Sequence, residues 1–263
     1  MEDGQEGAVT AEASVPNRVA WLSTERAEKV PELVARRIVR EITVNRLQAG
    51  HRLPPESEML ARFGVGRASL REALRILEAY GLIRVRPGPR GGPVVTDVKP
   101  SAFAQATTLH LHRRGATFRE LLEARLVLEP VMARLAAQQL TPASAEHLRD
   151  TTQLGRDALE AALEVFSAAT AAFHTVVAGT SGNRVLDLYS SALVAIERES
   201  VATAFTERTE RELTQHVHER IADAVLSGDG DRAEDLSRRH IRALVRHWEA
   251  TRPRFLDEGI QWR

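Results

Sequence analysis

The sequence predicts a mainly α-helical protein, in which an N-terminal winged helix-turn-helix domain precedes an all-α helical bundle. Residues 30–98 contain three amphipathic segments and then two short stretches with a strand pattern. Residues 101–255 contain six or seven amphipathic helices and no strand pattern. The chain of 263 residues is long enough for two domains with separate cores. We therefore expect a flexible arm (1–29), a winged helix-turn-helix domain (30–98), an all-helical domain (99–255) and a C-terminal tail (256–263).

Each element of the predicted winged domain has a local signal. The first helix starts near Pro31 and ends before the Gly and Pro residues of "QAGHRLPPE". A second helix covers residues 56–63 and ends at Gly64, and a third covers residues 67–80 and ends at Gly81. The stretches "LIRV" and "PVVTDV" then indicate two strands on either side of "RPGPRGG". Three helices followed by such a ribbon predict a winged helix-turn-helix.

Charge is distributed unevenly along the chain, although the formal net charge is zero. Residues 30–99 hold 13 Lys and Arg against 7 Asp and Glu, whereas the rest of the chain holds 23 against 29. A basic N-terminal segment is typical of a nucleic-acid-binding domain. The chain has no cysteine, which excludes disulfides and thiolate metal sites. It has no long apolar run and no signal-peptide pattern, so we expect a soluble cytoplasmic protein that does not associate with a membrane.

The third predicted helix carries two stripes of side chains. Leu70, Ala73, Leu74 and Leu77 follow the spacing of a buried face. Beside them, Arg67, Arg71 and Arg75 lie one helical turn apart. On an arbitrary amphipathic helix such a row is more often a solvated surface. Here the short "FGVG" turn before the helix, the local basic charge, and Arg86 and Arg90 in the ribbon favour a recognition helix with a DNA-contacting wing.

Polar residues on apolar stripes of the second half predict a buried polar site. Arg125 lies on the inward stripe of the helix after Thr117, where a guanidinium needs an anion. An internal ion pair, for example to Glu129, and an anchor for an acidic effector explain it equally well. His174, His218 and His240 lie on the inward stripes of three different helices. A lone buried histidine is usually a core residue, but three of them can converge on a metal such as zinc.

The stretch "GHRLPPESEMLARFGVGRASLREALRILEAYGLIRVRPGPRGGPVV" resembles the DNA-binding domain of the GntR family of bacterial transcription regulators. The matching motifs are Gly-x-x-Leu-Pro-x-Glu, Val-x-Arg-x-x-Leu-Arg-Glu-Ala-Leu and the Gly-Leu-Ile before the wing. The resemblance implies that Arg67 and Arg71 are the principal DNA contacts, with Ser69 and Gly88 of the wing in support. Arg75 and Arg90 complete the predicted DNA-binding set.

The second half resembles the effector-binding domain of the FadR-type subfamily, in "ELLEARLVLEP", "AAFHTVVAGTSGN" and "HERIADAVLSGD". Many relatives bind a divalent metal with three histidines and an aspartate one turn before the first histidine. The histidines correspond to His174, His218 and His240, but the aspartate position holds Thr170. The site then either holds a metal such as zinc at reduced affinity or is a metal-free polar pocket. The predicted effector residues are Arg125, Thr170, His174, His218 and His240.

Two functions compete on these residues. The first is a transcription regulator, expected to be a repressor, that binds a palindromic operator as a homodimer and responds to a small acidic metabolite. The second is a metal-dependent enzyme that uses the three histidines. The sequence shows no HExxH motif, no nucleophile elbow and no paired carboxylate beside the histidines, which favours the regulator.

Overall fold

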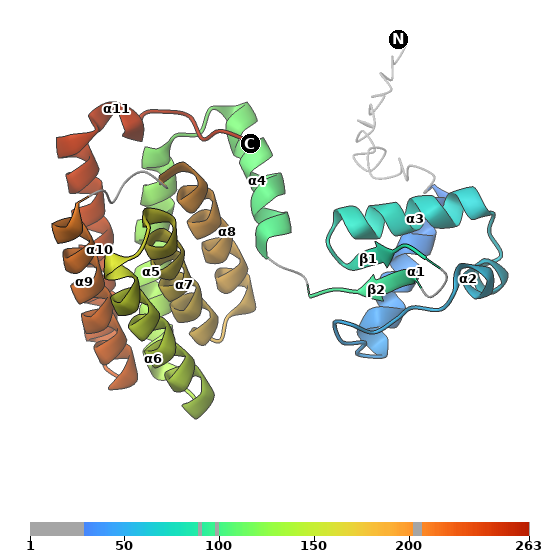
Figure 1. The fold of residues 1–263 in the computed structure, drawn as a ribbon, viewed down its shortest axis with the longest axis horizontal. Helices are drawn as coiled ribbons and strands as arrows, with labels where there is room; N and C mark the ends of the chain where they lie inside the picture. The colour runs from blue at the N-terminus through green and yellow to red at the C-terminus, as the bar shows by residue number, and fades with distance from the viewer. Residues whose placement is uncertain (1–28, 89–90, 98–99, 202–206, 263) are drawn as a thin grey trace, which may run out of the picture. The chain divides into compact units, whose positions relative to one another are not determined.

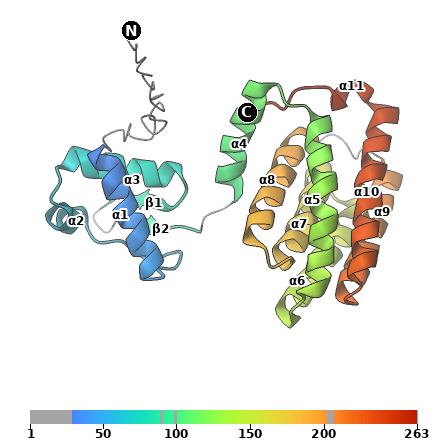
Figure 2. The same ribbon diagram turned by 180° about the vertical axis from the view of Figure 1, so that it is seen from behind.

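The computed structural model describes residues 29–88, 91–97, 100–201 and 207–262, without the side chains of residues 100–101 and 199–201. The chain forms two compact units, Met1–Asp97 and Val98–Arg263 (Figures 1 and 2). The predicted arm, except for Lys29, lies outside the described residues. The fold confirms the predicted class, a winged helix-turn-helix followed by an all-helical domain.

The N-terminal unit contains three helices and a two-stranded antiparallel sheet in which Ile83 pairs with Val95. In chain order these are α1 (Val30–Val44), α2 (Glu56–Phe63), α3 (Arg67–Ala79), β1 (Ile83–Arg86) and β2 (Gly92–Val95). The segment before α2 adds to the free edge of β2: Gly50 N donates to Val95 O at 2.8 Å, and Leu53 N donates to Pro93 O at 2.9 Å. These bonds attach the wing to the helices.

The core of this unit forms around α3. Its buried residues are the four that the spacing predicts, Leu70, Ala73, Leu74 and Leu77. They pack against buried side chains of the other elements, which are Val34, Ala35, Ile38, Leu53, Met59, Ile83 and Val95. Helix α2 ends at Gly64, whose φ of 64° lies in the left-handed region that glycine adopts at low cost. The chain can therefore turn sharply from α2 into α3.

The described residues of the C-terminal unit form seven long helices, which agrees with the expected six or seven, and two short ones. They are α4 (Pro100–Arg114), α5 (Phe118–Gln138), α6 (Pro142–Asp157), the 3₁₀ turn η1 (Ala158–Glu160), α7 (Leu163–Thr180), α8 (Arg184–Val201), α9 (Arg208–Leu226), α10 (Gly230–Thr251) and α11 (Pro253–Leu256). Helix α5 is central, because it contacts α7, α8, α9, α10 and α11 (Figures 1 and 2). Residues that project from the inner face of α5 therefore meet side chains from most of the bundle.

Helix α5 starts at a capping box. The Thr117 hydroxyl accepts a hydrogen bond from Glu120 N, and the Glu120 carboxylate accepts one from Thr117 N at 2.8 Å. The helix then continues through Pro130, which is buried and cannot donate a backbone hydrogen bond. Most of its inner face is apolar and joins α6, α7, α9 and α10 in one core. Arg125 and Glu129 are the buried charged residues on that face.

The residues after α11, which the sequence analysis set apart as a tail, return to the start of α5. Ile260 N donates to Ala116 O at 2.8 Å, and Gly259 forms a β-bridge with Thr117. Leu256 and Ile260 are fully buried, and the Phe255 ring stacks on Phe118 with centroids 4.5 Å apart. The end of the chain thus seals the α4–α5 corner of the bundle. None of the described helices is both long enough and apolar enough to cross a membrane.

Candidate DNA-binding surface and effector site

The N-terminal half of α3 presents arginines to solvent. Arg67 is the first residue of the helix, and Arg71 and Arg75 follow at one-turn intervals, all three exposed and outside the buried leucine stripe. Arg71 Nε lies 3.3 Å from Glu56 Oε1 of α2, and Arg75 Nη1 lies 3.5 Å from Glu72 Oε2. These ion pairs are solvent-exposed and therefore weak, so a phosphate or a guanine edge can replace them at small cost.

The start of α3 also leaves backbone donors open. Its N-cap is Gly66, which has no side chain to accept from the first N–H groups, and its first turn holds no acidic residue. Ser69 lies in that first turn and is partly exposed. Free N–H groups and the positive end of the helix dipole attract anions such as phosphate. The backbone and the arginine row therefore favour the same kind of ligand.

The wing carries positive charge on the open face of β1. Ile83 is buried in the core, while Arg84, Val85 and Arg86 are exposed. Gly88 follows with φ of 102°, and a Cβ at that position would meet no atom within 4 Å. The backbone at Gly88 is therefore accessible to a polymer such as DNA. Arg90, also predicted to contact DNA, lies outside the described residues.

In the helical domain the three predicted histidines converge. His174 of α7, His218 of α9 and His240 of α10 each offer a ring nitrogen, and these nitrogens lie within 4.8 Å of one another. The Nε2 atoms of His218 and His240 are 3.3 Å apart. Two imidazole nitrogens bound to one tetrahedral zinc, at about 2.0–2.1 Å each, are separated by about 3.3–3.4 Å. The three imidazoles, and the spacing of the His218 and His240 nitrogens, fit a zinc-like ion.

Neighbouring residues fix the orientation of two of these rings. Glu129 Oε2 accepts a hydrogen bond from His174 Nδ1 at 2.9 Å. The Nε2 atom of that ring then carries the electron pair that can bind an ion. The Phe173 ring stacks on His218, with centroids 4.2 Å apart and planes 12° apart. A carboxylate behind a ligand histidine is the usual support of a protein metal site. The sequence pattern did not reveal this second role of Glu129.

The surroundings keep two of the histidines neutral. Burial, together with the neighbouring His240 and His174, lowers the pKa of His218 well below its usual value. Burial and then His174 lower the pKa of His240 to about 3. Burial alone would raise the pKa of Glu129, but Arg125 and His174 outweigh it and hold the pKa of that carboxyl well below its usual range. Neutral imidazole and ionised carboxylate are the forms that bind metal.

Arg125 lies beside this cluster and contacts two carboxylates. Its Nε pairs with Glu129 Oε1 on the same helix, and its Nη1 pairs with Glu197 Oε2 of α8. The Arg125 side chain is 3% exposed and that of Glu197 is 12% exposed. The internal ion pair proposed from the sequence is therefore present. No sequence pattern indicated Glu197 as a partner, because "ERES" at the end of α8 has the composition of a charged surface.

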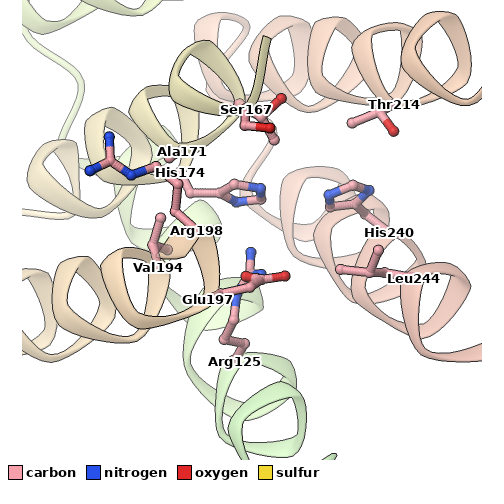
Figure 3. Close-up of a pocket in the computed structure, with 11 residues that line it drawn as sticks. Arg125, Ser167, Ala171, His174, Val194, Glu197, Arg198, Thr214, His240 and Leu244 are labelled. Atoms are coloured by element: carbon pink, nitrogen blue, oxygen red, sulfur yellow. The ribbon is translucent and has the colours of Figure 1, made fainter. Parts of the chain in front are cut away.

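A small cavity opens between these residues (Figure 3). Its lining includes Arg125, Ser167, Thr170, His174, Glu197 and His240. Its volume is about 40 Å³, enough for about two or three water molecules. The buried Ser167 Oγ has no hydrogen-bond partner among the described residues. Such an unpaired hydroxyl on a cavity wall is suited to a polar ligand.

A second cavity lies next to the first, between α9 and α10. Its volume is about 340 Å³, and it shares Thr214, His240 and Leu244 with the small cavity. Apolar side chains such as Val217 and Leu236 line it, and Arg220, Arg239 and Arg246 contribute positive charge. The two cavities together have room for an organic molecule whose polar end reaches the histidines.

A DNA-binding winged domain joined to a helical domain with an internal ligand site defines a transcription regulator. The comparisons agree with this class. Residues 32–91 match the model of bacterial regulatory proteins of the gntR family, and residues 120–243 match the FCD domain. The chain belongs to the GntR family, and its second half is the FadR-like FCD effector-binding domain.

Several relatives of the chain are named regulators. The chain is 31% identical to the HTH-type transcriptional regulator LutR of Bacillus subtilis, over 82% of this chain and 97% of the relative. It is 29% identical to the HTH-type transcriptional repressor NanR of Edwardsiella tarda, over 84% of this chain and 86% of the relative. The solved structure of Streptococcus agalactiae GntR superposes with a TM-score of 0.65 at 25% identity, covering 82% of this chain and 99% of that chain.

These comparisons decide between the two functions that the sequence left in competition. The matched domains and relatives are transcription regulators, so the protein is a DNA-binding regulator and not a metal-dependent enzyme. The three histidines and Arg125 then belong to an effector-binding domain rather than to a catalytic centre.

The arginine row on α3 generates the first prediction. Arg67→Ala and Arg71→Ala should each weaken binding to the cognate operator by about 1–3 kcal/mol, the cost of losing a bidentate base contact. The melting temperature should stay unchanged, because both side chains lie outside the core. Fluorescence anisotropy at fixed salt measures the affinity.

Two control variants separate the loss of a specific DNA contact from a general loss of charge and from a loss of stability. Arg40→Ala removes an exposed arginine of α1 and tests for a general loss of charge, while Leu70→Ala opens a cavity in the core and should lower the melting temperature. Operator affinity that is equal in the wild type, Arg67→Ala and Arg71→Ala would show that α3 does not read the DNA.

The lowered pKa of His240 generates a prediction about pH. An unfolded histidine takes up a proton below about pH 6.5, whereas folded His240 does so only near pH 3. Its contribution to stability is therefore complete above pH 6.5 and is lost as the pH falls toward 3. In the presence of a chelator, the free energy of unfolding should decline from pH 7 to pH 5 by at most about 1.4 kcal/mol per pH unit for this group.

Urea titrations at several pH values measure this decline. His240→Asn should flatten it, whereas His216→Asn, which removes an exposed histidine of the neighbouring helix, should leave it unchanged. If the curves of the wild type and His240→Asn run parallel between pH 7 and pH 5, the buried histidine does not resist protonation.

Proposed function

We propose that the protein is a repressor that binds a palindromic operator as a homodimer and releases it when a small acid binds in the helical domain. The observation that carries this proposal is the combination of an uncapped α3 start with the exposed Arg67, Arg71 and Arg75. One such helix contacts only a few base pairs. Two copies in adjacent major-groove segments supply the affinity and specificity that a regulator needs. Arg86 and Gly88 of the wing contact the neighbouring backbone or minor groove.

The second part of the proposal is a divalent metal, such as zinc, at His174, His218 and His240. The spacing of the His218 and His240 nitrogens and the Glu129 support of His174 favour it. Such an ion supplies a Lewis-acidic anchor for a carboxylate or hydroxyl group of the effector. Thr170, on the wall of the same cavity, offers only a neutral hydroxyl. The affinity for metal should therefore be lower than that of a site with an aspartate at this position.

The third part is the acidic nature of the effector. Arg125 borders the small cavity, and Ser167 Oγ and Thr170 add hydroxyl groups to its wall. An acid that enters this cavity can accept hydrogen bonds from the guanidinium and from both hydroxyls. The larger cavity between α9 and α10 accommodates the remainder of the molecule. Entry of the acid redistributes the contacts of Arg125, which connects α5 to α8 through Glu197.

The regulatory proposal is tested with operator DNA selected from random sequence by the purified protein. We expect a palindrome, a protein–DNA complex with two protomers, and a loss of affinity of at least about a hundredfold when one half-site is scrambled, since single half-site contacts resemble non-specific binding. A screen of carboxylic acids should then find one that releases the operator. Arg125→Ala should bind the operator normally but need more acid for release.

Three outcomes would contradict parts of this proposal. A selected site without symmetry, bound by one protomer, would rule out the dimer. Tighter binding in the presence of the acid would make the protein a corepressor-dependent regulator. Unchanged release in Arg125→Ala would leave this residue as an internal ion-pair partner only.

The metal proposal generates a prediction at Thr170. Thr170→Asp should bind zinc more tightly than the wild type, because it adds a charged ligand on the cavity wall. The shift of the unfolding midpoint with zinc measures this, since a hundredfold excess over the dissociation constant stabilises the fold by about 2.7 kcal/mol. In a metal-free pocket the same change buries an unpaired carboxylate and destabilises the fold. A wild type that shows no zinc response, with a destabilised Thr170→Asp, would exclude the metal.

A further inference from the structure

Negative charge close by strengthens the binding of a divalent ion at the three histidines. Three neutral imidazoles supply electron pairs but leave both positive charges of the ion uncompensated in a buried site. Buried ions in proteins are paired with carboxylates or other anions. The residue types that line the cavity therefore decide which group can balance the ion.

Two carboxylates, Glu129 and Glu197, lie close to the histidine cluster, and they differ in the number of partners that they already have. Both oxygens of Glu129 already have partners, because Oε1 pairs with Arg125 and Oε2 accepts from His174 Nδ1. Glu129 therefore orients His174 through its Nδ1 atom, and neither oxygen of Glu129 is left without a partner. Among the described residues that line the cavity, Glu197 is the acidic one.

Glu197 has a single partner. Its Oε2 pairs with Arg125, and among the described residues the carboxylate has no partner besides Arg125. The side chain is 12% exposed, so water compensates its other oxygen poorly. In Figure 3 the Glu197 carboxylate lies beside the Arg125 guanidinium and below the rings of His174 and His240, and all four residues line the same cavity.

We infer that Glu197 is the anionic partner of the metal, supplied from α8 because α7 offers only Thr170. One carboxylate oxygen stays on Arg125. The carboxylate is not within 4.8 Å of all three histidine nitrogens, so the Glu197 side chain has to turn toward the ion before its other oxygen can bind there together with the three imidazoles. Arg125 positions Glu197, and Glu129 positions both Arg125 and His174. The inference rests on the proposed metal site and assigns it a ligand from a fourth helix.

The test compares zinc affinity in four full-length proteins by competition with a chromophoric chelator. These are the wild type, Glu197→Gln, Thr170→Asp and the double variant Glu197→Gln/Thr170→Asp. Glu197→Gln keeps the shape and the hydrogen bond to Arg125 but removes the charge. It should weaken zinc binding at least about tenfold, the loss typical of a single group around a protein metal site. Glu164→Gln, which changes an exposed residue of α7, should bind zinc as the wild type does.

The double variant separates a ligand from a structural residue. If Glu197 supplies the charge, an aspartate at position 170 should restore at least most of the lost affinity. Cobalt in place of zinc gives a second readout, because the intensity of its visible absorption bands reports the number and type of ligands. The cobalt spectrum should change in Glu197→Gln and not in Glu164→Gln. Thermal unfolding in chelator checks that each variant is folded.

Each result bears on the inference. Equal zinc affinity in the wild type and Glu197→Gln would overturn the role of Glu197 while leaving the three-histidine site in place. A wild type without zinc affinity would overturn the metal site and this inference together, although the DNA-binding proposal would stand. Loss of zinc binding in Glu197→Gln that Thr170→Asp fails to restore, with an unchanged cobalt spectrum at saturating cobalt, would assign Glu197 a structural role only.

Discussion

The helical domain depends on the compensation of one buried positive charge. A guanidinium 3% exposed at the centre of a bundle is strongly destabilising unless anions surround it. Arg125 therefore determines what its neighbours must be: Glu129 one turn along its own helix, and Glu197 across the bundle on α8. Glu129 in turn orients His174 of α7. These charged contacts fix α5, α7 and α8 relative to one another. The small cavity and its histidines lie where these helices meet.

Under the proposed function, the same constraint is what lets the site respond to a ligand. Buried ion pairs add little net stability, because desolvation offsets most of the attraction, but removal of one partner is costly. A ligand acid or cation that changes the partners of Arg125 therefore changes the relative energies of helix arrangements. In the winged domain the arginines are exposed to solvent and form only weak ion pairs. DNA can therefore replace these ion-pair partners at small cost.

The sequence predicted the features that depend on local spacing. The leucine stripe of α3 follows a 3.6-residue period, so both its buried face and the exposed arginines beside it could be predicted. The three histidines could be predicted to converge, because each lies on the inward stripe of its own helix. The role of Glu197 could not, since its burial depends on a partner 72 residues earlier in the chain. The edge bonds of Gly50 and Leu53 and the packing of Ile260 are likewise contacts between distant segments.

The return of the chain end to the α4–α5 corner has a consequence for biosynthesis. The bond from Ile260 to Ala116 and the ring stack of Phe255 on Phe118 cannot form until residues 255–260 have left the ribosome. The winged unit contains all of its own core within the first 97 residues and can fold long before that point. The DNA-binding unit is therefore complete early, whereas the helical domain stays open until residues 255–260 have been synthesised. A nascent or truncated chain would contain the DNA-binding domain but not a completely folded effector-binding domain.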